Sequence, residues 1–174
     1  MSTVKLSEAM GDIDNDSGYI DELAKPLVDA CCGKLDDFIK YVSSIISDRD
    51  NPVTDAELDD IILTIPTLVY FAGEMQEQLG IKYDVSNTRR QNIFNSTIVN
   101  TSGTVMDKKA IAELGTEELD MIKIVYARAY NCIKMKISTA MELLQSAKKI
   151  VSRRMQSLEL SNVTRNSDRR ITDE

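Results

Sequence analysis

Apolar residues recur at steps of three and four along most of the chain, which is the spacing of a helix face. Between residues 19 and 48 this repeat predicts a first long helix. A second helix is expected to begin after Thr54, because Thr54 and Glu57 have the spacing of a capping box. We expect this helix to end at Gly80, since glycine suits a left-handed C-terminal cap better than any other residue.

The pattern changes in the segment STIVNTSGTVMD, residues 96–107. Two short β-prone runs there flank a turn that contains Asn and Gly, and this arrangement predicts a small β-hairpin near residues 96–107. Asp107 is then expected to cap a short helical piece that ends at Gly115.

The last predicted element is the longest, because the chain contains neither Gly nor Pro from Glu117 to about Leu160. About 44 residues at 1.5 Å each span roughly 66 Å, whereas a globule of this length is about 32 Å across. Part of the apolar seam of this helix is therefore expected to contact another subunit; the alternative is a bent or broken helix in a monomer. The predicted interface residues are Ile122, Tyr126, Ile133, Ile137, Leu144 and Val151.

Together these elements predict a mainly α fold, a helical bundle with a long C-terminal helix and one small β-hairpin. Residues 18–160 would form a single helical domain. Residues 1–17 are acidic and residues 161–174 are polar, and both segments are expected to be disordered.

The composition argues against catalysis and against metal or cofactor binding. The chain of 174 residues has no histidine, and its three cysteines, Cys31, Cys32 and Cys132, form no CxxC pair. Phosphate-binding and nucleophile motifs are absent, so we expect neither an enzyme nor a cofactor. No apolar run approaches the ~20 residues of a membrane span, and the N-terminus does not resemble a signal peptide. We therefore expect no membrane partner and a cytoplasmic location, in the host cell if the protein is phage-encoded.

Charge is distributed unevenly along a chain whose net charge is −7. Residues 1–60 hold 5 Lys and Arg against 15 Asp and Glu, whereas residues 122–174 hold 11 against 5. An acidic half joined to a basic half is a pattern of proteins that bind polyanions.

The cations gather at three places that are candidates for DNA contact. The segment SAKKIVSRRM, residues 146–155, holds four cations that project onto one broad helix flank, more than a favourable helix dipole explains. Two further basic pairs bracket the predicted hairpin, with Phe94 between them as either a base-stacking platform or a core residue. The candidate DNA-binding residues are Arg89, Arg90, Lys108, Lys109, Lys148, Lys149, Arg153 and Arg154.

The order of these segments carries a resemblance to a known family. A capped helix with LTIPTLVYFAGEM is followed by the basic strip VSNTRRQNIFN. After a hairpin comes the long helix LGTEELDMIKIVYARAYNCIKMKISTAMELLQSAKKIVSRRM. Over about residues 58–159 this layout resembles the UvsY-type recombination mediators of tailed phages.

The resemblance implies a ring-like homo-oligomer that binds single-stranded DNA. It also implies a role in loading a RecA-like recombinase onto strands covered by single-strand binding protein. In that family a basic strip of Lys-x-Arg form contacts DNA. Here Thr88 stands at the lysine position and Arg90 at the arginine position, with Arg89 between them.

Two other classes of function fit the same sequence. In a helical phage assembly or adaptor protein, the cations would dock acidic segments of neighbouring copies, such as residues 12–22 or 48–60. In an acidic inhibitor of a host protein, the first 60 residues would be the working face, because small acidic helical proteins can mimic DNA.

Overall fold

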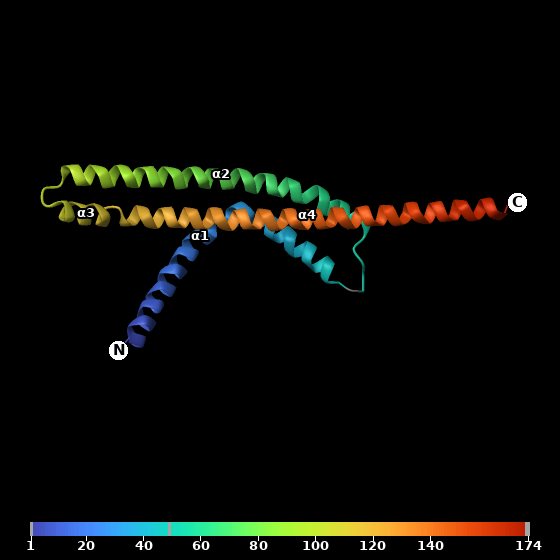
Figure 1. The fold of residues 1–174 in the computed structure, drawn as a ribbon, viewed down its shortest axis with the longest axis horizontal. Helices are drawn as coiled ribbons and strands as arrows, with labels where there is room; N and C mark the ends of the chain where they lie inside the picture. The colour runs from blue at the N-terminus through green and yellow to red at the C-terminus, as the bar shows by residue number, and fades with distance from the viewer. Residues whose placement is uncertain (1, 49, 173–174) are drawn as a thin grey trace. The chain divides into compact units, whose positions relative to one another are not determined.

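Four α-helices make up the chain in the computed structural model, which describes residues 2–48 and 50–172, with side chains for 13–48 and 50–161. The mainly α prediction is confirmed (Figure 1). The helices are α1 (Ser2–Ser47), α2 (Asp55–Asn100), α3 (Val105–Leu114) and α4 (Glu117–Thr172).

The predicted β-hairpin at residues 96–107 is wrong, since the described residues contain no strand. Thr97, Ile98 and Val99 of this segment lie in the last turn of α2, where Thr97 and Ile98 are half-buried. Intrinsic strand propensity is weak, and burial on a helix face outweighs it. A four-residue turn then follows, in which Gly103 has a φ of +128°.

Helix α3 is capped three residues earlier than expected, and Asp107 is not its N-cap. Thr104 is the N-cap: its hydroxyl accepts a hydrogen bond from the Asp107 N–H. The Asp107 carboxylate accepts from the Thr104 hydroxyl and N–H, at 2.6 and 3.2 Å. These bonds lower the pKa of Asp107 below its usual value. The predicted end at Gly115 is confirmed, because Gly115 is the C-cap.

The capping box at the start of α2 is confirmed. The Glu57 carboxylate accepts hydrogen bonds from the Thr54 N–H at 2.7 Å and the Thr54 hydroxyl at 2.8 Å. The Glu57 N–H donates in return to the Thr54 hydroxyl oxygen at 3.3 Å. Bonding to Thr54 lowers the pKa of Glu57, so this carboxylate stays charged further into the acidic range than a free glutamate does.

Gly80 does not end α2, which continues for twenty residues beyond it to Asn100. Its role is close packing against α4: a Cβ atom at Gly80 would lie 3.4 Å from Cε2 of Tyr130. A glycine inside a helix often marks such an approach, so Gly80 is a packing position and not the predicted C-terminal cap.

The chain divides into two compact units. The first contains α1 up to Gly33 together with Phe71–Lys136. Within it α2 and α4 run side by side and antiparallel (Figure 1). Arg90 of α2 is paired with Asp120 of α4, and ten residues back along α2, Gly80 meets Tyr130, ten residues further along α4. Four alanines and Cys32 are small buried side chains, which allow close helix approach. The buried apolar residues of this unit are Ala24, Val28, Cys32, Ala72, Leu79, Ala112, Val125, Ala129 and Ile133.

The second unit contains Lys34–Tyr70 and α4 from Ile137 onward. Its core is aliphatic, with contributions from α1, α2 and α4: Leu35, Val42, Leu58, Ile61, Ile65, Ala140, Leu144 and Ala147. The apolar repeat that predicted the helices therefore also supplies their buried faces.

Two segments were expected to be disordered, residues 1–17 and residues 161–174. Residues 1, 173 and 174 lie outside the described residues, as do the side chains of 1–12 and 162–174. The expectation of disorder remains a prediction, although α1 begins at Ser2 and α4 ends at Thr172.

We predict that Gly80→Ala raises the free energy of unfolding by up to about 1 kcal/mol, because alanine favours a helix over glycine by that amount. The added Cβ would meet Tyr130 at an ordinary contact distance. Urea denaturation measures the change. Gly103→Ala is the control and should destabilise, since alanine is strained at a positive φ. Equal losses for both variants would mean that α2 ends at Gly80.

Candidate nucleic-acid interface

Three unpaired cations lie on the part of α4 that belongs to the second unit. Lys148, Lys149 and Arg153 are exposed and form no ion pair with any described residue. At 100° per residue, Lys149 and Arg153 project away from the buried Ala147. We call these three residues the α4 cations.

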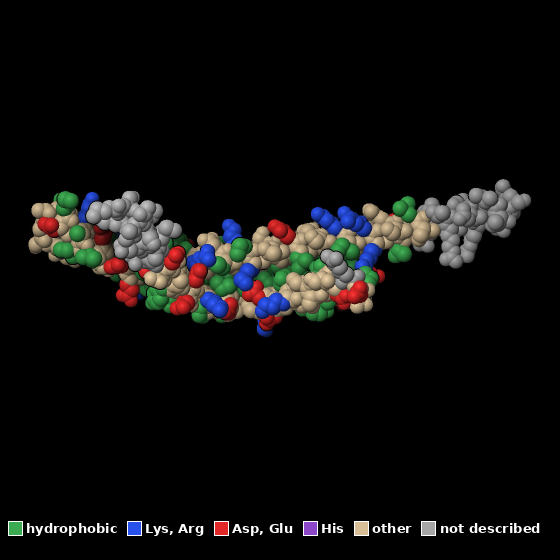
Figure 2. Space-filling model, turned by 90° about the horizontal axis from the view of Figure 1, so that it is seen from below, with side chains coloured by type: hydrophobic (Ala, Val, Ile, Leu, Met, Phe, Trp, Pro, Cys, Tyr) green, Lys and Arg blue, Asp and Glu red, His purple; other side chains and the backbone are tan. Residues whose placement is uncertain are grey.

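Arg154 lies beside them in sequence but faces its own chain. Its Nη1 is 2.5 Å from Oδ1 of Asp55, and its Nη2 donates to the Val53 carbonyl at 2.5 Å. The predicted flank of four cations is thus divided, with three directed to solvent and one held at the start of α2. Figure 2 shows lysine and arginine side chains in small groups among acidic ones on the face that it displays.

Arg89 and Arg90, in the first unit, also have different surroundings. Arg90 Nε is 3.0 Å from Oδ2 of Asp120, and its guanidinium lies 5.2 Å from the centre of the Phe94 ring. Arg90 therefore fastens α2 to α4, and Phe94 is half-buried beneath a cation. Arg89 is exposed and has no ion pair among the described residues.

Lys108 and Lys109 both lie on α3, where Lys108 is half-buried and Lys109 is exposed. They do not follow a hairpin, because none is formed. The first unit thus holds Arg89, Arg90, Lys108 and Lys109, and the second holds Lys148, Lys149, Arg153 and Arg154. The described chain does not gather the eight candidates into one site.

The predicted interface residues on α4 differ in how far the chain itself buries them. Ile133 and Leu144 are 0% and 2% exposed and belong to the cores of the chain itself. Tyr126, Ile137 and Val151 are half-buried, and Ile122 is exposed.

The seam opens beyond Ala147, where Met155 and Leu158 are 58% and 64% exposed. Val151, Met155 and Leu158 continue the same helical spacing and are named here the open seam. The chain covers Ile133, Leu144 and Ala147 of the stripe and leaves the open seam largely uncovered.

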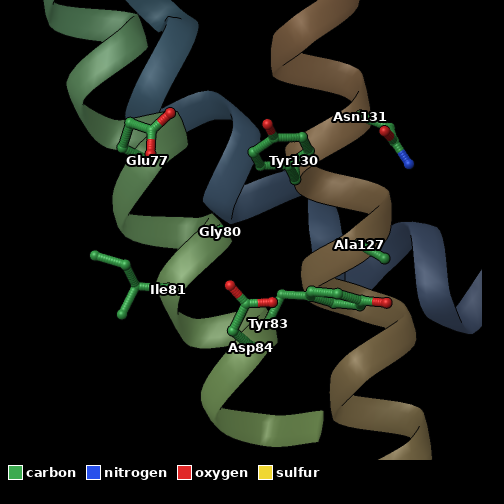
Figure 3. Close-up of a pocket in the computed structure, with 8 residues that line it drawn as sticks. All are labelled: Glu77, Gly80, Ile81, Tyr83, Asp84, Ala127, Tyr130 and Asn131. Atoms are coloured by element: carbon green, nitrogen blue, oxygen red, sulfur yellow. The ribbon is translucent and has the colours of Figure 1, made fainter.

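A groove of about 460 Å³ lies between α2 and α4 within the first unit (Figure 3). Gly80 makes room for it, and Tyr83 and Tyr130 point between the two helices. The carboxylates of Glu77 and Asp84 also line it. Their negative charge disfavours a phosphate backbone, so the groove is not part of the candidate interface.

The three cysteines lie on helices, and none of them forms a disulfide among the described residues. Cys32 is buried, whereas Cys31 and Cys132 are half-buried. Burial raises the pKa of Cys31, an effect that the charge of Lys82 partly opposes. Within the described chain no group of three or more Cys, Asp or Glu residues is arranged to hold a metal ion.

No helix in the described ranges combines the length and the apolar character needed to cross a bilayer. Comparisons with known protein families, with curated proteins and with solved structures found no match.

We predict that Arg90→Ala lowers the free energy of unfolding by about 0.5–1 kcal/mol, because it removes a partly buried ion pair and a cation–π contact. Arg89→Ala is the matched control on the same helix and should change stability by less than about 0.5 kcal/mol. Thermal or urea denaturation separates the two. Equal losses would show that the Asp120 pair contributes nothing.

Proposed function

We propose that the chain is a non-enzymatic recombination mediator that binds single-stranded DNA as a homo-oligomer and helps to load a RecA-like recombinase. The observation that carries this proposal is the position of the α4 cations on the same stretch of helix as the open seam. The role in recombinase loading rests on the resemblance of residues 58–159 to UvsY-type mediators.

The α4 cations are suited to binding the phosphate backbone of a nucleic acid. Lys149 and Arg153 are one helical turn apart and free to neutralise phosphates. Two or three phosphate contacts bind weakly at physiological salt, because each releases only one condensed counterion. A single copy therefore holds a strand loosely.

The open seam offers a way to combine several such weak contacts. Val151, Met155 and Leu158 are apolar and incompletely covered, and burying them against other copies is favourable. Linked copies raise the effective concentration of each cationic site for the same strand. Binding is then firm for the assembly while each contact remains easily exchanged, which suits a protein that hands a strand to a recombinase.

An adaptor function is the second candidate, and specific contacts favour it. Arg128 pairs with Asp21 at 2.9 Å, and Arg154 pairs with Asp55. These two aspartates lie in the acidic segments 12–22 and 48–60, so basic α4 recognises both segments within one chain. An adaptor would make similar pairs between copies and would show no affinity for a labelled oligonucleotide, even at low salt.

We predict that the double variant Lys149→Gln, Arg153→Gln weakens binding to a labelled oligo-dT and flattens its salt dependence. Loss of two phosphate contacts should reduce the slope of log K against log salt by about 1.4. Fluorescence anisotropy at several salt concentrations gives both quantities.

The matched control is Lys25→Gln, Lys34→Gln, which removes the same charge from exposed positions on α1. It should leave the salt slope nearly unchanged. Equal slopes for the wild type and for the α4 double variant would remove Lys149 and Arg153 from the site, and no binding by the wild type at low salt would favour the adaptor.

A further inference from the structure

Arg154 contacts the beginning of α2 through both of its terminal nitrogens. One terminal nitrogen reaches a carboxylate oxygen of Asp55, and the other reaches the Val53 carbonyl oxygen. Both acceptors lie within the second unit. A planar guanidinium presents paired donors that fit carboxylate and phosphate oxygens equally well.

A groove of about 580 Å³ surrounds this contact. Arg153 and Arg154 line it from successive positions of α4, and Arg153 has no ion pair among the described residues. The Ser157 side chain lines it one turn further on, and Asp55 closes it from α2. The groove thus combines one free guanidinium, one occupied guanidinium and a hydroxyl group with the apolar side chains of Ile150 and Leu158.

We propose that this groove is a phosphodiester-binding position and that Asp55 occupies it when no nucleic acid is bound. This inference rests on the proposed function, because it concerns the same single-stranded ligand. A strand that enters the groove exchanges one anionic partner of Arg154 for another. The exchange forms and breaks no covalent bond and moves no proton.

Asp55 is placed so that it can leave without undoing α2. Its side chain is 85% exposed, and an exposed ion pair is weak and is screened by salt. The cap of α2 is made by Thr54 and Glu57, so it does not depend on Asp55. Release of Asp55 therefore leaves the first turn of the helix capped.

The competition lowers the affinity of each copy for DNA. Part of the favourable contact between Arg154 and a phosphate is offset by loss of the Asp55 pair. In the other direction, Asp55 recaptures Arg154 as a strand departs, which helps release. The acidic segment 48–60 then acts on the basic end of α4 as an internal competitor for phosphate.

The test compares full-length Asp55→Asn with the wild type in binding to labelled oligo-dT by fluorescence anisotropy. The variant should bind about two- to fivefold more tightly, the scale of an exposed ion pair. Its salt slope should steepen by up to about 0.7, because Arg154 then meets a phosphate with no internal anion to displace.

Asp59→Asn is the matched control, since it removes the same charge from an exposed position of α2 that pairs with no described residue. It should tighten binding less than Asp55→Asn does. The gain in affinity for oligo-dT must also depend on Arg154. When Arg154→Gln is already present, adding Asp55→Asn should raise the affinity no more than Asp59→Asn does.

Two results would overturn the inference while leaving DNA binding intact. One is equal affinity of Asp55→Asn and Asp59→Asn for oligo-dT. The other is that Asp55→Asn raises the affinity as much in the Arg154→Gln background as in the wild type. If neither the wild type nor Asp55→Asn binds oligo-dT at low salt, the proposed function and the inference fall together.

Discussion

The apolar stripe of α4 must pack against other helices to be shielded from water. The last of its residues that helices of the same chain bury is Ala147, and Met155 and Leu158 beyond it are exposed. In the first unit, α1 and α2 contribute small buried side chains, and Gly80 allows Tyr130 of α4 to lie close to α2. In the second unit, Leu144 and Ala147 are buried together with core residues of α1 and α2. Beyond them the stripe continues as the open seam, which the proposed self-association would remove from water.

The cations also fall into two groups, those paired with aspartates of the same chain and those exposed to solvent. The acidic half of the chain is paired in part with basic residues of α4, and the pairs join residues that are far apart in sequence. Arg90 and Arg154, which pattern alone groups with their exposed neighbours, are held by aspartates of the chain. The cations that remain unpaired, such as Lys149 and Arg153, are the ones that a polyanion can reach without competition.

The parts of the fold that depend on local chemistry could be predicted from the sequence. The capping box of Thr54 and Glu57 and the start of the long helix at Glu117 both appear in the structure, because caps and periodicity act within a few residues. The predicted hairpin is wrong because its residues depend on contacts distant in sequence. Whether Thr97 and Ile98 extend a helix or form a strand is decided by what buries them, and that is not local.

The candidate site was less predictable still. An Arg-Arg dipeptide does not reveal that Arg90 faces Asp120, thirty residues away, while Arg89 faces solvent. The residue spacing predicts an apolar seam on α4, but spacing alone cannot separate Ile133, which its own chain buries, from Leu158, which is exposed. Sequence reasoning also missed the groove at Gly80, for which the only signal was a glycine within a helical repeat.

Light scattering of the purified full-length chain at micromolar concentration, without DNA, tests most directly whether other copies cover the open seam. The account predicts a mass that is a multiple of the 19.5 kDa chain. A mass of one chain at every concentration measured would contradict it.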